Sequence, residues 1–137
     1  SNLYYLLNRG YPIKSASVFV GNHYLLSERQ RLALVRAISP KEKIRLRMDK
    51  ELKGSLEGCT VNIDGFNLII TMEVAFSGSP LLKCMDGTIR DLAGLRGTYR
   101  LIDKTDMAIT RIGKVLESNQ IRKAVFYLIH RFLIQAG

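Results

Sequence analysis

Asp64 and Asp86 are the two residues of this chain whose positions most directly suggest a chemical role. Asp64 ends the run Cys59–Asp64, Asp86 directly follows the run Leu81–Met85, both runs are predicted to be strands, and a glycine follows each aspartate. If both runs are parallel strands, their carboxyl ends form the ligand crevice of an α/β sheet. Neighbouring strands lie about 4.8 Å apart, so the two carboxylates could hold one Mg²⁺ or Mn²⁺ ion, whose water could attack a phosphodiester. The alternative is that both Asp-Gly pairs are only turn dipeptides.

Two further acids, Glu73 and Asp91, are candidate auxiliaries of this site. Glu73 lies about six residues beyond Asn67 on a predicted helix, or roughly 9 Å along its axis. That distance prevents Glu73 from sharing an ion with Asp64 unless the helix folds back over the sheet edge. Its apolar neighbours predict burial, and a buried glutamate is usually paired, for example with Arg90. Asp91 lies in a connection, and its role is open.

The positive charge lies mostly in the N-terminal part of the chain. Of the net charge of +9, residues 1–58 carry +6, from 11 Lys and Arg against 5 Asp and Glu. A basic region suggests contact with a polyanion such as RNA or DNA, because neutralised phosphates supply affinity without sequence preference. Aromatic residues are not interleaved with these charges, so a solvated, solubilising surface is an equal alternative.

Arg29, Arg31 and Arg36 are the candidate phosphate contacts, because they lie on a predicted helix that could be the second of a helix-turn-helix. The predicted connection, from Gly21 to Leu26, is longer than the usual turn of about 3–4 residues in that motif. A plain αα-hairpin is therefore the favoured interpretation of this segment.

The remaining pattern predicts an α/β fold with a helical N-terminal region. Residues 1–58 form a basic helical region, in which a capping box of Ser27 and Gln30 starts one helix and Ser39-Pro40 starts another. Residues 59–137 form a small α/β domain, in which alternating strands and helices indicate a parallel sheet with right-handed crossovers. The expected helices are 3–7, 14–20, 28–38, one after Pro40, 68–75 and 104–116; the expected strands are 59–64, 81–85 and 124–128.

Composition and motifs exclude several classes of protein. No apolar stretch reaches the roughly 18 residues of a membrane span, and without a secretory leader the expected location is cytoplasmic. Cys59 and Cys84 are expected to be buried free thiols on neighbouring strands. The chain contains no Walker A, dinucleotide-binding or nucleophile-elbow motif.

Several stretches resemble one known family. They are Leu6–Pro12, Val20–Ser27, Asp64–Asn67 with Glu73 and Ser77-Gly78, Asp86-Gly87, Arg90–Leu92 and Gly97–Arg100. Together they resemble the archaeal and bacterial family catalogued as domain of unknown function 434, over nearly the whole chain to about Leu128. That family has no established activity. The C-terminal half is also similar in layout to PIN/NYN-like ribonuclease domains, and this resemblance implies a Rossmannoid, PIN-like domain whose strand-end acids hold a metal.

The last nine residues, 129–137, depart from the pattern of that family, which continues with D-x-P-V-S-N-S-G. Residues 129–136 can be encoded as ATT CAC CGG TTT CTA ATT CAG GC, and one additional G in front changes this to GAT TCA CCG GTT TCT AAT TCA GGC, or D-S-P-V-S-N-S-G. We hypothesise a one-base deletion that truncates the domain. The lost aspartate would have followed the third strand, and the apolar residues 132–134 would favour self-association.

The sequence therefore predicts a metal-dependent, PIN-like ribonuclease fold with Asp64 and Asp86 as ligands and Glu73 and Asp91 as auxiliaries. Loss of a third acid by truncation would leave this chain inactive. The alternatives are a non-catalytic nucleic-acid-binding module and an assembly protein that forms homo-oligomers.

Overall fold

A computed structural model describes residues 1–92 and 104–128, which form two compact units. The described part of the first, the helical unit, comprises Ser1–Leu52 and residues 80–92. The described part of the second, the α/β unit, comprises Lys53–Ser79 and residues 104–128. The predicted α/β class is confirmed in its coarse form, since these residues contain six helices and a small parallel sheet. No described helix is both long and apolar enough to span a membrane.

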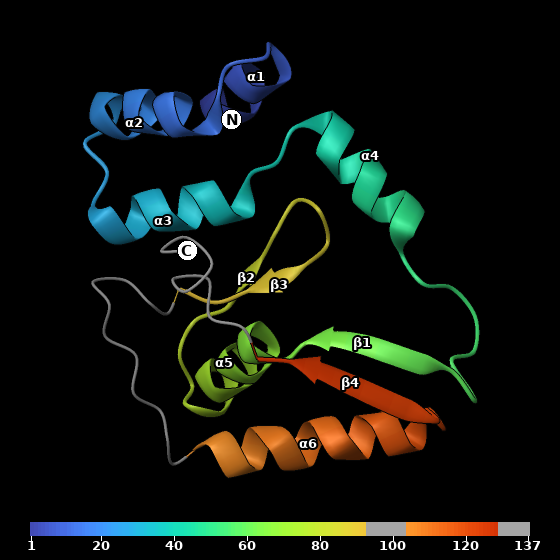
Figure 1. The fold of residues 1–137 in the computed structure, drawn as a ribbon. Helices are drawn as coiled ribbons and strands as arrows, with labels where there is room; N and C mark the ends of the chain where they lie inside the picture. The colour runs from blue at the N-terminus through green and yellow to red at the C-terminus, as the bar shows by residue number, and fades with distance from the viewer. Residues whose placement is uncertain (93–103, 129–137) are drawn as a thin grey trace. The chain divides into compact units, whose positions relative to one another are not determined.

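Four helices begin the helical unit, as predicted: α1 (Asn2–Asn8), α2 (Ile13–His23), α3 (Glu28–Ala37) and α4 (Lys41–Lys50) (Figure 1). The core of the unit is small and lies between α1 and α2. It consists of Leu3, Leu7, Ala16 and Val20, against which Leu6, Leu34 and Ile38 pack. No residue of α4 is buried, so its side chains contribute nothing to this core.

The capping box at the start of α3 is confirmed, but the predicted stop at Gly21 is wrong. The Ser27 hydroxyl accepts from the Gln30 amide N–H, and the Gln30 side chain accepts from the Ser27 N–H. Gly21 lies inside α2, where a Cβ atom would be 2.8 Å from Nη1 of Arg31. The glycine therefore allows close packing of an arginine rather than ending the helix. The connection to α3 is consequently short, residues 24–27.

The start of α4 also differs from the sequence-based interpretation, in which residues 39–42 form a second capping box with Pro40 as the first helical residue. Pro40 occupies the N-cap position and its side chain makes no capping hydrogen bond. Instead, Oδ1 of Asn8, at the end of α1, accepts from the Lys41 amide N–H at 2.8 Å. A residue distant in sequence thus caps this helix.

The prediction that Leu81–Met85 belongs to the parallel sheet is wrong. Strand β2 (Leu82–Lys83) pairs antiparallel with β3 (Ile89–Arg90) in a hairpin of the helical unit. The Met85 amide N–H donates to the Ala37 carbonyl at 2.9 Å, which attaches the hairpin to the end of α3. The apolar run indicated a strand but not its partner, and Asp-Gly is a strong hairpin signal.

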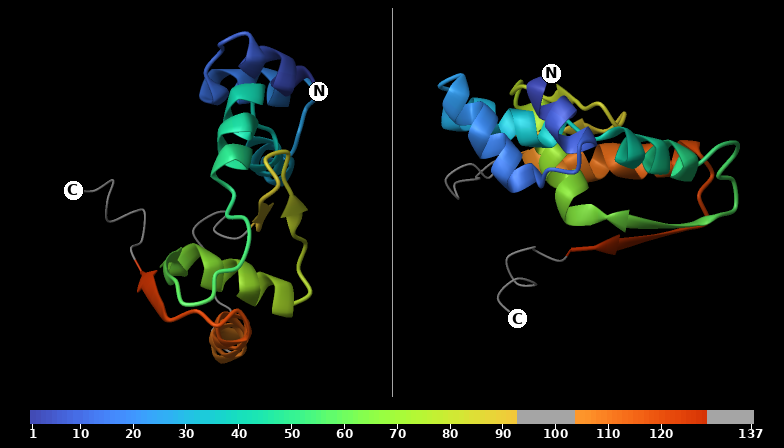
Figure 2. Two further views of the ribbon diagram at one scale, coloured as in Figure 1. Left: turned by 90° about the vertical axis from the view of Figure 1, so that its right-hand side faces the viewer. Right: turned by 90° about the horizontal axis from the view of Figure 1, so that it is seen from above.

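The α/β unit contains β1 (Thr60–Asp64), α5 (Gly65–Phe76), α6 (Thr105–Ser118) and β4 (Lys123–Tyr127). The two strands are parallel, in a register from Thr60 opposite Lys123 to Asp64 opposite Tyr127. Helix α5 packs against both strands and against α6, which is viewed end-on in the left panel of Figure 2. These elements were predicted within a few residues.

Three other predictions have different outcomes. Cys59 and Cys84 are free, but only Cys84 is buried and the two belong to different units. The aberrant tail proposed from residue 129 lies outside the described residues. The PIN-like assignment, the division of the chain after residue 58 and a homo-oligomeric state stay predictions.

Candidate functional site

Asp64 ends β1, as predicted, and its carboxylate also caps the helix that follows. Oδ1 accepts from the Asn67 amide N–H at 3.5 Å and Oδ2 accepts from Nδ2 of Asn67 at 2.6 Å. Gly65 comes next because the end of β4 lies close to it: a Cβ atom there would be 3.0 Å from Leu128 and 3.1 Å from Phe126. The D-G-F-N sequence is thus explained by a strand-to-helix turn, and a metal-binding role of Asp64 stays a prediction.

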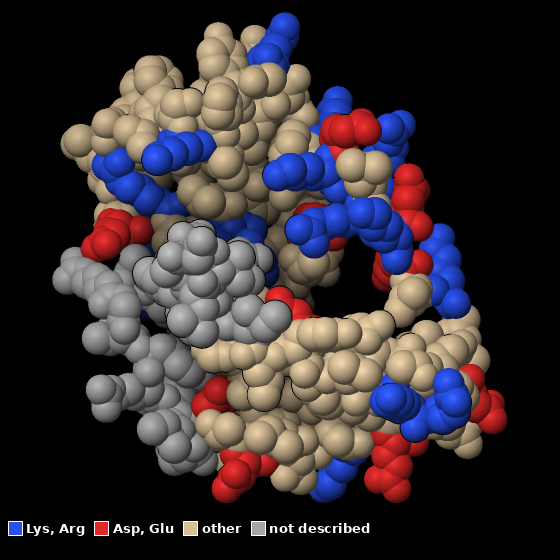
Figure 3. All heavy atoms as spheres, in the orientation of Figure 1, with Lys and Arg blue, Asp and Glu red and all other residues tan. Residues whose placement is uncertain are grey.

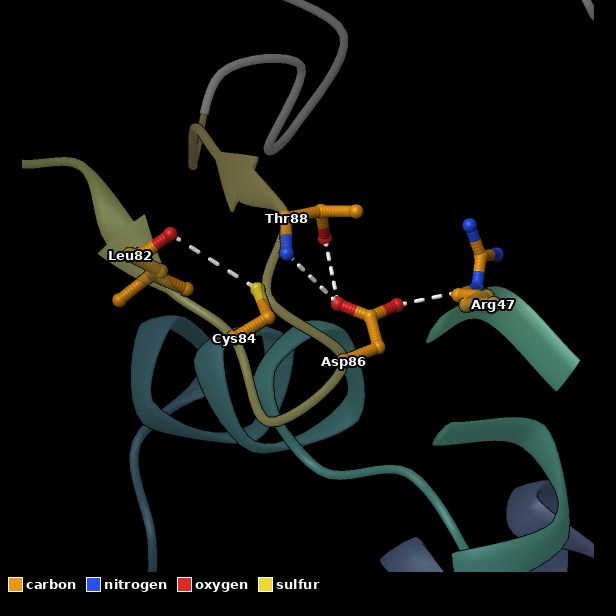
Figure 4. Close-up of polar contacts among 5 residues, drawn as sticks. All are labelled: Arg47, Leu82, Cys84, Asp86 and Thr88. Carbon is orange, nitrogen blue, oxygen red and sulfur yellow. Dashed lines mark hydrogen bonds and ion pairs between the residues drawn. The ribbon is translucent and has the colours of Figure 1, made fainter. Parts of the chain in front are cut away.

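Asp86 lies in the turn of the β2–β3 hairpin, where its carboxylate binds three groups (Figure 4). Oδ1 accepts from the Thr88 amide N–H at 3.0 Å and from its hydroxyl at 2.6 Å. Oδ2 lies 3.0 Å from Nε of Arg47 on α4, and the Asp86 side chain is only 8% exposed. Burial raises the pKa of Asp86, but the Thr88 hydrogen bonds and the charges of Arg47 and Arg90 outweigh it and lower the pKa below its ordinary value. The aspartate is therefore held as an anion at the surface of α4.

Glu73 is buried in the α/β unit, with 4% of its surface exposed, as predicted. Its Oε2 accepts from the Thr105 hydroxyl at 2.7 Å. The suggested partner Arg90 belongs to the helical unit. Glu73 thus joins α5 to the first residue of α6 through a neutral partner.

Asp91 and Arg36 attach β3 to α3. Nη1 of Arg36 donates to the Asp91 carbonyl at 2.6 Å and lies 3.6 Å from its carboxylate.

Arg31 stabilises the connection between α2 and α3. Its guanidinium donates to the carbonyls of Gly21 and Leu26 and to the side chain of Asn22, at 2.8–3.0 Å. Of the three arginines predicted to contact nucleic acid, Arg29 is exposed, and Arg31 and Arg36 are half-buried.

The four predicted acids are divided between the units: Asp64 and Glu73 in one, Asp86 and Asp91 in the other. The premise that placed Asp64 and Asp86 at one sheet edge is wrong, because β2 pairs with β3 and not with β1. Within residues 1–92 and 104–128, no group of three or more His, Cys, Asp or Glu residues could hold a metal ion. A metal-binding role of these four acids stays a prediction.

Sequence reasoning predicted the helix α4 but did not select its basic residues as candidate site residues. Lys43, Arg47 and Lys50 recur at i, i+4 and i+7, which places them on one side of the helix. All three are exposed, and basic side chains gather over α4 in Figure 3. A groove of about 320 Å³ lies between this helix and the hairpin turn, lined by Arg47, Met48, Lys50, Glu51, Asp86, Gly87 and Thr88. We call Lys43, Arg47 and Lys50 the basic ridge; their spacing alone could have identified it.

Positive charge is concentrated in the helical unit. Its described residues contain 12 Lys and Arg against 6 Asp and Glu, a net charge of +6. The described α/β unit contains 6 against 5, a net charge of +1. The excess positive charge of the described residues therefore lies mostly in the helical unit.

Two family models match the chain. One, described as a protein of unknown function (DUF434), matches residues 1–50, and the other, a domain of unknown function (DUF5616), matches residues 53–131. The resemblance to the first family over nearly the whole chain is thus corrected to its N-terminal part. An uncharacterized protein of Methanocaldococcus jannaschii is 39% identical over 126 residues, which cover 90% of this chain and 60% of the relative. No solved structure matches the chain.

Proposed function

The chain belongs to the family described as domain of unknown function 5616, and we propose that this protein binds nucleic acid through the basic ridge of its helical unit. The observation that carries this proposal is the composition of α4, which has five basic and two acidic residues and buries none of its side chains. Packing therefore does not account for the sequence of this helix. A row of exposed cations can neutralise successive phosphates, whatever the base sequence.

The contact between Arg47 and Asp86 supports the proposal further. Asp86 engages Nε of Arg47, and the two terminal nitrogens lie on the side away from the carboxylate (Figure 4). The Arg47 side chain is 59% exposed. A guanidinium held in one orientation loses less freedom on binding, and its planar fork matches two phosphate oxygens. Thr88 orients Asp86 in turn, so the hairpin turn supports the centre of the ridge.

A charge-removal experiment tests this proposal. Fluorescence anisotropy would measure the binding of a labelled, mixed-sequence RNA of about 20 nucleotides at several salt concentrations. For the triple variant K43Q/R47Q/K50Q, we expect weaker binding. The slope of log affinity against log salt concentration should also be smaller in magnitude by about 2, because each of the three lost phosphate contacts contributes roughly 0.7 on a single strand. The control R111Q/K114Q/K123Q removes the same charge from exposed positions of the α/β unit. Equal losses in both variants, or no salt-sensitive binding, would contradict the proposal.

Metal-dependent ribonuclease activity of a PIN-like domain is the second proposal. Its support is that Asp64 is exposed at the carboxyl end of a parallel strand, where ligands of α/β sheets gather. Mg²⁺ or Mn²⁺ would be the ion, with Glu73, Asp86 and Asp91 as the other candidate residues. Paramagnetic broadening of NMR signals by Mn²⁺ tests it: broadening centred on Asp64 and abolished by Asp64→Asn supports a metal site, and uniform or absent broadening contradicts it.

A further inference from the structure

A cluster of exposed aromatic rings lies on α1 and α2 of the helical unit. Tyr5, Phe19 and Tyr24 are 58%, 65% and 54% exposed. The rings of Phe19 and His23 are stacked with an interplanar angle of 10° and centroids 6.4 Å apart, and Tyr24 meets His23 edge-on at 4.7 Å. The side-chain amide of Asn2, one helical turn before Tyr5, donates to the Tyr24 hydroxyl, which links α1 to these rings. We call Tyr5, Phe19, His23 and Tyr24 the ring cluster.

The core does not account for these rings. The buried residues of α2 are Ala16, Ser17, Val20 and Gly21. Phe19 and His23, four residues apart, share another side of the helix and remain exposed. Large apolar rings left in water cost free energy that burial would recover, so a binding partner is a reason to keep them at the surface.

The charges around the ring cluster favour an anionic partner. Residues 1–27 contain two basic residues, Arg9 and Lys14, and no Asp or Glu. The guanidinium of Arg9 lies over the Tyr5 ring, 4.8 Å from its centroid. The same segment holds five of the 11 Phe and Tyr residues of the chain. Ring faces in a segment that has cations and no carboxylates match a base attached to a phosphate chain.

We infer that the ring cluster binds unpaired bases, so that the nucleic acid bound by this protein is single-stranded. This inference rests on the proposed function, in which the basic ridge binds phosphates. A base exposes its face for stacking only where it is unpaired and unstacked, and every base has such a face. The ring cluster therefore selects single strands over duplexes without selecting a base sequence.

The test compares three probes of about 12 nucleotides: a single strand, a duplex, and an abasic strand that keeps the phosphates and lacks the bases. The variant F19L/Y24L keeps apolar side chains and removes two rings. We expect it to bind the single strand about 10-fold more weakly, as when one base loses its stacking partner. Its affinity for the duplex and the abasic strand, and its salt slope, should equal those of the wild type.

The matched control is Tyr11→Leu, which removes another exposed tyrosine, located between α1 and α2 and outside the ring cluster. Circular dichroism would show that each variant is folded. The single-strand measurement is made in parallel with a U-only RNA and a T-only DNA. A loss of affinity of F19L/Y24L that is confined to the single strand supports the inference with either probe. The probe that the wild type binds more tightly shows whether RNA or DNA is preferred.

The outcomes distinguish failure of this inference from failure of the proposed function. If the K43Q/R47Q/K50Q variant weakens binding but F19L/Y24L leaves single-strand affinity unchanged, or weakens abasic binding equally, the inference is overturned and the proposed function survives. If no probe binds the wild type, both are overturned.

Discussion

The helical unit and the α/β unit each shield a carboxylate from solvent, and they pair it differently. Asp86 in the helical unit has a cationic partner, Arg47, together with Thr88. Glu73 in the α/β unit accepts from the neutral hydroxyl of Thr105. The charged pair lies at an exposed helix and orients a surface cation, whereas the neutral pair lies inside and joins two helices. A buried acid can thus orient a surface side chain or join interior helices, and the charge of its partner distinguishes the two roles.

The largest expected effect is a loss of stability in the α/β unit that leaves the helical unit unchanged. Gly65→Ala would place a Cβ atom 3.0 Å from Leu128 and 3.1 Å from Phe126. We expect the free energy of unfolding to fall by about 1–3 kcal/mol because the end of β4 must shift. Gly113→Ala is the control, since among the described residues no atom outside the chain neighbours and the backbone of its own helix lies within 4 Å of a Cβ atom there. Alanine in this helix interior should stabilise by about 1 kcal/mol. Urea denaturation measures both, and equal effects would show that the contacts of Gly65 are unimportant.

A smaller effect should follow when the neutral partner of Glu73 is removed. Thr105→Val keeps the shape of the side chain but leaves the buried carboxylate without this hydrogen bond. We expect a loss of about 1–2 kcal/mol in the free energy of unfolding. Thr105→Ser, which keeps the hydroxyl, should lose less than half as much. If valine and serine behave alike, the hydroxyl does not stabilise Glu73.

The smallest effect concerns the charged pair and depends on pH. Because the folded pKa of Asp86 lies below its ordinary value of 3.8, the carboxylate stabilises the fold above that value and loses this contribution as pH falls through the folded pKa. Asp86→Asn should cost about 1 kcal/mol near neutral pH, since Arg47 is largely exposed and the amide oxygen can still accept from Thr88. The difference from wild type should shrink as pH approaches about 2.

Asp49→Asn removes an exposed acid of α4 and serves as the control for this pH dependence. Its unfolding curves should match those of the wild type throughout. A difference between the Asp86 variant and the wild type that stays constant across the pH range would exclude ionisation of Asp86 as its cause.

Local signals in the sequence predicted the helices and strands, whereas contacts between residues distant in sequence determined the strand pairing and the role of Gly21. Ser27 and Gln30 identified the start of α3, and the position of Asp64 at a strand end was found from apolar patterning. The role of Gly21 could not be found in this way, because Arg31, ten residues later, requires it. Likewise, four apolar residues among the five before Asp86 indicated a strand without identifying its antiparallel partner.

The candidate site was only partly predictable for the same reason. The acids Asp64, Glu73, Asp86 and Asp91 were chosen for their chemistry, but the topology divides them between two units. The partners Thr105, Thr88 and Arg47 carry no local signal, since each comes from another element or turn. The spacing of the basic ridge was visible in the sequence, and its exposure was not.

The cap that Asn8 supplies to α4 has a consequence for how the basic helix comes to exist. A helix of ten residues is marginal by itself in water, and here its first amide is satisfied by a side chain 33 residues earlier in the chain. An excised peptide of residues 39–52 would lack that group and also the aspartate that restrains Arg47. The placement of these cations on one side of a stable helix therefore depends on the assembled unit, and short peptides that copy this segment would reproduce its charge without its geometry.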